Sequence, residues 1–535
     1  MMQFPVSRSF QLLITVLLFV PSLHAQTYTD LYDFDDAHGC CATYAGLLAQ
    51  GRDGNLYGGT VSDGKHGFGT VFKVTLAGGL TTLYDFDSSD GIGAQGGLSL
   101  GLDGNFYGTT YQGGSQHAGT IFKITPSGNL TTLYNFGNLN DGAYPKVPPT
   151  PAPDGNLYGN TGNGTVAVVY KITPNGSFTV LTNLASHSET PLYLGTDGLL
   201  YGMTPYGGDF NDGTFFSVTT KGVLKIIHSF DSPTGSQPFG SLLQASDGNF
   251  YGTTSSGGTG GGGVVFRLTV AGAYTVLHNF STNDKVGGST PQAGVVQGSD
   301  GFLYGGTTTG GSVGAGVMFR LSTGGSGFSV ISTFDGTHGS SPSPSPVLDT
   351  NGVIYGLTHT GGPSDDGVFY SMNAGLQPFA ELFVISSGKV GTTVQILGQG
   401  FTGTKTVSFN GTPATFTVLS DTFLGAKVPN GATTGKVTIT EANGTLNTPQ
   451  SFRVTPQLLS FSPPSGPVGT VVTITGVSLT QTEGVGFGNY NPAKFTVNSD
   501  TQVTATVPTG AATGPVGILT KGGLAISSAT FTVTP

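Results

Sequence analysis

Asp-Gly-Asn-Phe-Tyr-Gly, at residues 103–108, is the stretch of sequence that decides the fold, because the chain repeats it. Three further copies keep the same pattern with Leu or Phe before the tyrosine, and three looser copies keep the glycines and the tyrosine. The repeated tyrosines are Tyr57, Tyr107, Tyr158, Tyr201, Tyr251, Tyr304 and Tyr355. They lie 43 to 53 residues apart, and a period of this length is typical of a repeat architecture.

Each repeat unit contains four short runs with the composition of β-strands. In the second unit these runs are residues 97–102, the tyrosine strand that follows, GTIFKIT at 119–125 and LTTLYNF at 130–136. They are rich in β-branched and aromatic residues, and Asp-Gly between the first two suits a tight hairpin turn. We therefore predict an all-β fold in which residues 26–376 form a seven-bladed β-propeller, because radial closure removes long exposed sheet edges.

The ends of the repeat array predict how the propeller closes. Residues 27–34 (TYTDLYDF) resemble the last, outermost strand of a unit, yet they precede the first unit. We expect them to complete blade seven. In such a blade the loops from outermost to innermost strand, and those from second to third strand, share one face. We call this the loop face, and the tight Asp-Gly turns lie on the opposite face.

Two copies of another module follow the repeats, at residues 377–455 and 456–535. PFAELFVISSGKVGTTVQILGQGF at 378–401 matches PQLLSFSPPSGPVGTVVTITGVSL at 456–479. Alternating apolar strands separated by Gly, Pro and Asn turns predict a small β-sandwich for each copy. The expected architecture is thus a seven-bladed β-propeller followed by two immunoglobulin-like domains.

Two family resemblances support this architecture. The Asp-Gly-Asn-Leu-Tyr-Gly motif resembles the GloVer, or Gloeo/Verruco, tandem repeats of bacterial exported proteins. That resemblance implies a propeller and export more than it implies an activity. The Ser-Gly-x-Val-Gly-Thr and Val-Pro-x-Gly-Ala-x-Thr-Gly-x-Val patterns resemble the IPT/TIG immunoglobulin-like family, which implies spacer or interaction modules.

The first 25 residues read as a secretory signal peptide. Arg8 precedes the apolar run 10–20, and a small residue, Ala25, ends the segment. An uncleaved membrane anchor is the alternative, but the run is shorter than the ~20 residues that a bilayer crossing needs. We expect no transmembrane span elsewhere and a protein that is secreted or held at the cell-envelope surface.

Charge and cysteine content narrow the partners. The chain has 29 acidic and 19 basic residues, which argues against nucleic acid and anionic membrane surfaces as partners. Cys40 and Cys41 are the two cysteines of the chain, and because they are adjacent they form either a vicinal disulfide or two free thiols. We expect a monomer.

The loop face is where we expect a ligand to bind, because loops differ between blades while strands repeat. Aromatic rings there can stack on a sugar or a peptide. The candidate ligand-binding residues are His38, His66, Tyr111, His117, Tyr144, His187, Tyr206, His338 and His359. The histidines lack metal-ligand spacing, so no metal residues are assigned. Calcium is the one cofactor that the abundant loop acids leave open.

Motifs for catalysis are missing from the sequence: Gly-x-Ser-x-Gly, Walker A and His-Glu-x-x-His do not occur. We therefore expect a binding protein whose ligand is an extracellular glycan, peptide or matrix component. The alternative is an extracellular enzyme that acts on polysaccharide or a lyase-type propeller, since residues 123–128 (KITPSG) resemble the rhythm of streptogramin-lyase propellers. A purely structural envelope or matrix protein is the third alternative.

Overall fold

The computed structural model describes residues 26–41, 47–138, 140–162, 166–282, 284–442, 444–488 and 491–535. The expected signal peptide, residues 1–25, lies outside these residues. In the described part of the chain, no helix combines the length and hydrophobicity that a bilayer crossing would require.

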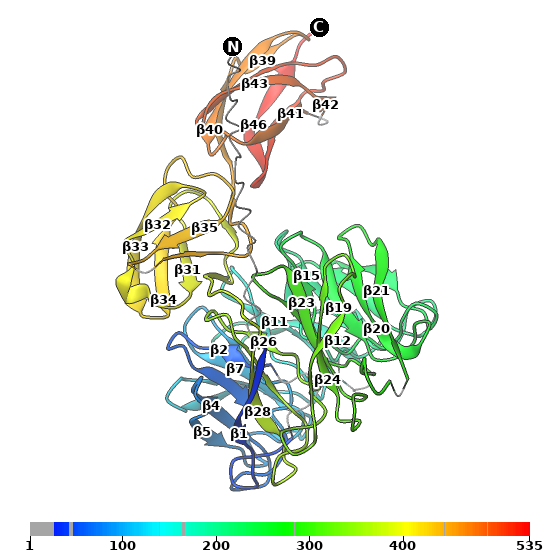
Figure 1. Ribbon diagram of the computed structural model, residues 1–535. Coiled ribbons are helices and arrows are strands. Elements are labelled where there is room, and N and C mark those ends of the chain that lie inside the picture. The colour runs from blue at the N-terminus through cyan, green and yellow to red at the C-terminus, as the bar shows by residue number, and fades with distance from the viewer. Residues whose placement is uncertain are drawn as a thin grey trace, which may run out of the picture.

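Residues 27–373 form seven four-stranded antiparallel sheets arranged like the blades of a propeller, as the repeat predicts (Figure 1). Blade one consists of β2 (Ala49–Gln50), β3 (Leu56–Gly59), β4 (Thr70–Val74) and β5 (Leu80–Asp85). Blade two consists of β6 (Leu98–Leu100), β7 (Phe106–Thr110), β8 (Thr120–Ile124) and β9 (Leu130–Asn135). Blade three consists of β10 (Thr150–Pro151), β11 (Leu157–Asn160), β12 (Ala167–Ile172) and β13 (Phe178–Leu184).

The remaining blades repeat this plan. Blade four consists of β14 (Tyr193–Leu194), β15 (Leu200–Thr204), β16 (Thr214–Val218) and β17 (Leu224–Ser229). Blade five consists of β18 (Leu243–Gln244), β19 (Phe250–Thr254), β20 (Gly261–Leu268) and β21 (Tyr274–Ser281). Blade six consists of β22 (Val295–Gln297), β23 (Phe302–Thr307), β24 (Val317–Ser322) and β25 (Ser329–Thr333). Blade seven consists of β26 (Val347–Leu348), β27 (Ile354–Leu357), β28 (Val368–Asn373) and β1 (Thr27–Asp33).

Blade seven closes the ring in the way that the sequence predicts. Its outermost strand β1 comes from the other end of the repeat array and pairs antiparallel with β28. The register runs from Thr27 opposite Asn373 to Asp33 opposite Val368. One sheet therefore holds both ends of the array, so no blade can separate without breaking strand pairing.

The repeated Asp-Gly-Asn-Leu-Tyr-Gly motif has two structural roles: it closes a hairpin turn and it packs one blade against the next. In blade one, Asp53 accepts hydrogen bonds from the backbone and side-chain nitrogens of Asn55, at 3.2 and 2.7 Å, which closes the hairpin turn. The hairpin reading of the motif is thereby confirmed. The Tyr57 ring is fully buried and stacks on Phe106 of the next blade with ring centroids 4.0 Å apart. The motif thus joins each blade to its neighbour.

The two C-terminal modules are β-sandwiches with separate hydrophobic cores. We call them the first and second TIG domains. The first comprises β29 (Glu381–Phe383), β30 (Ser387–Gly388), β31 (Thr393–Leu397), η1 (Phe401–Gly403), β32 (Thr406–Phe409), β33 (Thr412–Ser420), β34 (Phe423–Lys427), β35 (Val437–Thr440), β36 (Thr445–Asn447) and β37 (Arg453–Val454). The second comprises β38 (Gln457–Ser462), β39 (Ser465–Gly466), β40 (Val471–Val477), β41 (Thr482–Phe487), β42 (Asn491–Pro492), β43 (Lys494–Ser499), β44 (Gln502–Thr506), β45 (Gly514–Thr520) and β46 (Gly523–Val533).

The first TIG domain is docked on the propeller, on the face that carries the Asp-Gly turns. The hydroxyls of Ser420 and Thr422 each donate a 2.7 Å hydrogen bond to the backbone oxygen of Arg52. The Arg52 guanidinium lies over the Phe423 ring, 4.4 Å from its centroid. The second TIG domain follows farther from the propeller, with the C-terminus at its end (Figure 1). The loop face lies on the opposite side of the propeller from these contacts.

Candidate ligand-binding site on the loop face

Four of the nine candidate residues meet in one cluster on the loop face. They are the tyrosines Tyr111, Tyr144 and Tyr206 together with His187, and they contact a lysine and a glutamate that lie between them. We call the whole group the aromatic loop cluster; its members are Tyr111, Tyr144, Lys146, His187, Glu189 and Tyr206. The loops that carry it come from blades two, three and four, so the cluster spans adjacent blades.

One side of the cluster is a pair of tyrosines. The rings of Tyr111 and Tyr144 have centroids 5.4 Å apart and are tilted by 43°. Tyr144 has a left-handed backbone with φ of 53°, which is costly for a residue with a side chain. Its backbone nitrogen donates a 2.8 Å hydrogen bond to the Ala118 oxygen, so the loop of the neighbouring strands holds it there. The ring is therefore positioned by the fold.

The centre of the cluster is a shielded ion pair. Lys146 Nζ lies 2.6 Å from Glu189 Oε1, and His187 Nε2 lies 3.1 Å from the same oxygen. The side chains of Lys146 and Glu189 are only 20% and 12% exposed. Burial acts to raise the pKa of Glu189, but hydrogen bonds from His187 and Lys146 outweigh it and hold that pKa below its ordinary value. The glutamate is thus an anion that Lys146 and His187 hold at the centre of the cluster.

The other side of the cluster is the aromatic edge formed by Tyr206. Its ring centroid lies 5.4 Å from that of His187, with the planes inclined by 53°. Tyr206 is 37% exposed, and Phe210 on the same loop between β15 and β16 is 61% exposed. Exposed aromatic rings on a loop are costly to keep in water, and they commonly mark a binding surface. The cluster therefore presents aromatic faces on both sides of a charged centre.

The other five candidate residues do not extend this arrangement into one site, although His117 lies on the same loop between β7 and β8 as Tyr111. His38 and His338 each pair with an aspartate three residues earlier, at 2.6 Å from Asp35 and 2.9 Å from Asp335. His66 and His117 are exposed at loop tips. His359 is half-buried, and its backbone nitrogen donates to the Ser341 oxygen. These five residues stay predictions of a wider ligand surface.

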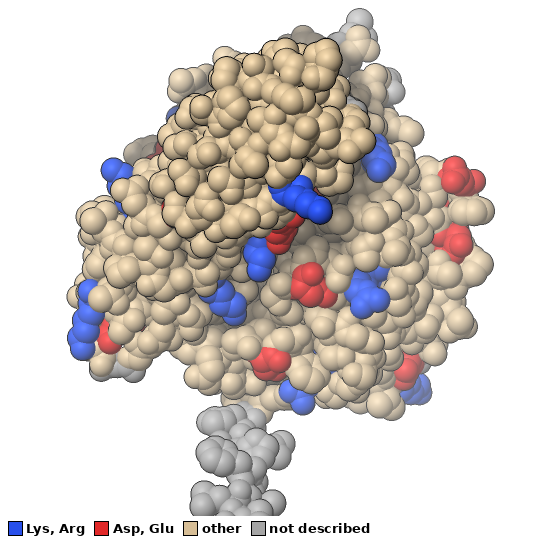
Figure 2. Space-filling view, turned by 90° about the horizontal axis from the view of Figure 1, so that it is seen from above, with Lys and Arg blue, Asp and Glu red and all other residues tan. Residues whose placement is uncertain are grey.

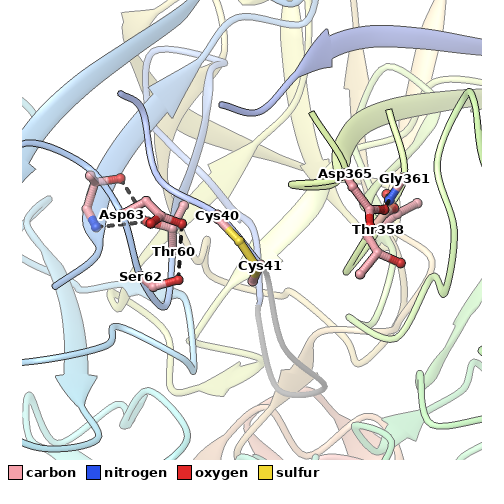
Figure 3. Close-up of a disulfide and its surroundings, with 10 residues drawn as sticks. Cys40, Cys41, Thr60, Ser62, Asp63, Thr358, Gly361 and Asp365 are labelled. Atoms are coloured by element: carbon pink, nitrogen blue, oxygen red, sulfur yellow. Dashed lines mark hydrogen bonds between the residues drawn. A yellow bond between two sulfur atoms is a disulfide. The ribbon is translucent and has the colours of Figure 1, made fainter. Parts of the chain in front are cut away.

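Cys40 and Cys41 form the vicinal disulfide that the sequence left open. Figure 3 shows the bridge between the loop that carries Asp63 and the loop that carries Asp365, at the boundary of blades one and seven. Carboxylate oxygens of Asp36, Asp63 and Asp366 lie within 4.8 Å of one another nearby. Oxygen ligands of this kind suit calcium, but exposed acids often gather without an ion, so calcium stays a prediction.

Lys146 and Glu189 are the members of the cluster that we do not assign from the sequence. Their spacing in the sequence could have identified them, because both lie in loops that join one blade to the next. Lys146 stands two residues after Tyr144, and Glu189 stands two residues after His187. Residues two apart in extended backbone project to the same side, so each polar residue follows its aromatic or histidine neighbour onto the loop face.

Family models match nearly all of the chain. The Gloeobacter/Verrucomicrobia repeat matches residues 16–193 and 188–413, and the IPT/TIG domain matches residues 378–454 and 456–534. Among curated proteins, no sequence matches the chain.

Solved structures give distant matches. A surface glycan-binding protein from Prevotella bryantii is 20% identical over 29% of this chain and 41% of its own, with a TM-score of 0.23. A gluconolactonase from Xanthomonas campestris is 14% identical over 58% of this chain and 91% of its own, with a TM-score of 0.36. A fungal alcohol oxidase in complex with copper is 13% identical over 95% of this chain and 99% of its own, with a TM-score of 0.46.

These structural likenesses concern the fold, and we take no activity from them. The chain also spans less than half of the Prevotella protein, 41% of its length. The repeat model, in contrast, covers well over half of the 535 residues. The chain therefore belongs to the Gloeobacter/Verrucomicrobia repeat family and carries two IPT/TIG domains after its repeats.

Proposed function

We propose that this chain is an exported binding protein that holds an extracellular glycan in the aromatic loop cluster. The observation that carries the proposal is the arrangement of Tyr111 and Tyr144 on one side, and Tyr206 on the other, of the shielded Lys146–Glu189 pair. A sugar ring has apolar faces and a rim of hydroxyls, so it matches aromatic faces that flank hydrogen-bonding groups.

The charged centre favours a neutral, hydroxyl-rich ligand. Lys146 and Glu189 already neutralise each other at 2.6 Å, so the cluster has no free charge to offer a strongly charged partner. Their unused donor and acceptor positions suit sugar hydroxyls, which both donate and accept. Because the pair is shielded from water, a hydrogen bond to it gains strength from the lower local dielectric.

The two TIG domains suit the role of spacer domains that hold the loop face of the propeller accessible to a ligand. The first TIG domain is docked on the face opposite the loops, through Arg52 and Phe423, and the second has its own core. A surface protein arranged in this way directs its loop face away from its C-terminal domains. Export itself follows from the signal peptide expected at residues 1–25.

The test is a binding measurement on the full chain without residues 1–25. A panel of bacterial and plant polysaccharides is screened, and the affinity for any hit is measured by calorimetry. We expect Tyr111→Ala and Tyr144→Ala each to weaken binding about tenfold, equivalent to about 1.4 kcal/mol. Tyr32→Ala is the matched control, because Tyr32 lies on β1 and packs on Phe34, away from the cluster. Equal affinity in the wild type and both cluster variants would contradict the proposal.

A second measurement separates binding from catalysis. The same polysaccharides are incubated with the protein, and new reducing ends or unsaturated products are followed over time. Binding without turnover is expected. Turnover that Glu189→Gln abolishes would overturn the binding proposal in favour of the alternative, an enzyme that acts on polysaccharide.

A further inference from the structure

A pocket of about 480 Å³ lies between the propeller and the first TIG domain. Innermost strands of blades three to seven form its propeller side, with Leu194, Leu243 and Val347 among the wall residues. The start of the TIG domain, from Phe379 to Ser386, forms the other side. The volume lies within the range of ~300–1,000 Å³ that is typical of small-molecule sites. We call it the interdomain pocket.

The pocket is held open by hydrogen bonds around its rim. Gln450 Nε2 donates to the Gln244 backbone oxygen at 3.0 Å, and Arg453 donates to the Thr196 backbone oxygen. On the other side Gln399 Nε2 donates to Asp349 Oδ1 at 3.2 Å and to the hydroxyl of Thr350 at 3.0 Å. These contacts fix the TIG domain against blades four, five and seven, so the pocket exists before any ligand arrives.

Glu381 of β29 is the one charged residue among the described residues that line this pocket. Glu381 is an exposed residue, and it lines the open interior of the pocket. No described residue donates a hydrogen bond to its carboxylate. A carboxylate that has no protein partner can pair with a cation that enters the pocket, and the apolar walls beside it strengthen such a pair by lowering the local dielectric.

A second acid strengthens the negative potential at this place. Asp349, which follows β26, is fully buried, and its Oδ2 atom has no hydrogen-bond partner in the described structure. Burial raises the pKa of Asp349 to about 6. The protein around the pocket reduces the hydration of the Glu381 carboxylate, and this together with the charge of Asp349 raises the pKa of Glu381 to about 7. Neither Glu381 nor Asp349 therefore forms a salt bridge with a basic residue in the described part of the chain.

The rest of the described pocket surface does not supply a basic partner for these acids. Around the TIG domains, charged side chains are sparse and of mixed sign (Figure 2). Arg453 donates a hydrogen bond to the backbone oxygen of Thr196, which lines the pocket. The Tyr193 hydroxyl stays neutral, because burial raises its pKa. The walls combine leucine, valine, proline and phenylalanine side chains with threonine and serine hydroxyls and three glutamine amides, and the apolar side chains suit an apolar body.

We infer that the interdomain pocket binds a small organic amine, whose ammonium group pairs with Glu381 and whose apolar body packs on the leucine and valine walls. The site lies on the opposite side of the propeller from the aromatic loop cluster and is independent of the glycan proposal. Phe379 and Phe383 lie beside Glu381 in the lining, and aromatic faces add to the binding of a cation.

The pH dependence of binding follows from Glu381. The ammonium group pairs with the ionised carboxylate, and the pKa of Glu381 in the free protein is about 7. Affinity therefore falls as the pH drops through 7, about tenfold between pH 8 and pH 6, while the amine itself stays protonated. Asp349, with its pKa of about 6, adds to the loss at the acid end.

The experiment uses the full chain without residues 1–25 and three probes of the same shape. These are 2-phenylethylammonium, the neutral 2-phenylethanol and the anion 3-phenylpropanoate. Calorimetry at pH 8 should show the ammonium binding at least tenfold more tightly than the alcohol, and no binding of the anion. An ammonium that binds no better than the alcohol would overturn the inference without any variant.

Variants then assign the effect to one carboxylate. Glu381→Gln should weaken ammonium binding at least tenfold and remove its pH dependence between pH 6 and pH 8. Glu483→Gln is the matched control, because Glu483 is an exposed residue of β41 in the second TIG domain. Tyr111→Ala should leave amine binding unchanged, which separates this site from the glycan site. Unchanged binding by the Glu381→Gln protein would show that Glu381 does not hold the ligand.

Discussion

The Asn351 side-chain nitrogen donates a 3.1 Å hydrogen bond to the hydroxyl of Tyr355, whereas each of the six other repeat tyrosines donates to an aspartate. In blade one the Tyr57 hydroxyl lies 2.9 Å from Asp53 Oδ2. Blade seven, which β1 closes, therefore has a neutral pair where the others have a charged acceptor. This difference provides a comparison within one chain.

Removing the tyrosine hydroxyl should lower the free energy of unfolding more in blade one, at Tyr57, than in blade seven, at Tyr355. A hydrogen bond to a charged group contributes about 1.5–3 kcal/mol, and one between neutral groups about 0.5–1.5 kcal/mol. We expect Tyr57→Phe to lower the free energy of unfolding by the larger amount and Tyr355→Phe by the smaller. Denaturant unfolding of the two variants measures both losses, and equal losses would contradict this reading of the motif.

The Lys146–Glu189 pair should stabilise the loop face in a pH-dependent way. Because the pKa of Glu189 is lower in the folded protein than its ordinary value of 4.5, its contribution is complete above that value. The contribution is lost as the pH falls through the lower, folded value. We expect Glu189→Gln to cost about 1–3 kcal/mol at pH 7 and much less at pH 3. Unfolding at both pH values tests this, with Lys146→Met as the partner variant, and a cost that is the same at both would refute it.

Arg52 should control the docking of the first TIG domain. Its guanidinium lies over Phe423 and its Nη2 atom donates to Gln395 Oε1 at 3.2 Å. We expect Arg52→Ala to loosen the domain, which small-angle X-ray scattering would detect as a larger radius of gyration. Arg52→Lys should not restore it, because lysine lacks the planar fork of donors.

Arg320→Ala is the matched control for this docking experiment. Arg320 also lies over a phenylalanine, Phe302, at 5.1 Å, but that pair is within blade six. Its loss should leave the radius of gyration unchanged. If both arginine variants expand the protein equally, the effect is a general loosening and not a release of the TIG domain.

Reduction of the Cys40–Cys41 disulfide should change stability little. The two residues are adjacent, so the bridge closes almost no loop and removes little entropy from the unfolded chain. The chain-entropy estimate is about 1 kcal/mol for so short a loop, against about 3 kcal/mol for a 15-residue loop. Thermal unfolding with and without dithiothreitol measures the difference, and Cys41→Ser serves as the permanently reduced reference. A large drop would show that the bridge organises the loops of blades one and seven.

The sequence by itself determined the number of blades, the four strands in each and the closing role of residues 27–34. These features are set by local chemistry: Asp-Gly turns, alternating apolar residues and a tyrosine that packs on the next repeat. Because every unit repeats the same interactions, the period appears directly in the sequence. Asp53 acts within its own unit, and Tyr57 packs on the next unit in the same order along the chain.

Only the tertiary structure decided which loop residues meet. Lys146 and Glu189 are 43 residues apart, and Thr422 and Arg52 are 370 residues apart. Contacts of this kind join side chains that differ from unit to unit, so they leave no periodic signal. Four of the nine candidate residues converge because their loops belong to neighbouring blades. The interdomain pocket arises where a sandwich domain meets the innermost strands, and its unpaired Glu381 looks in the sequence like any surface glutamate.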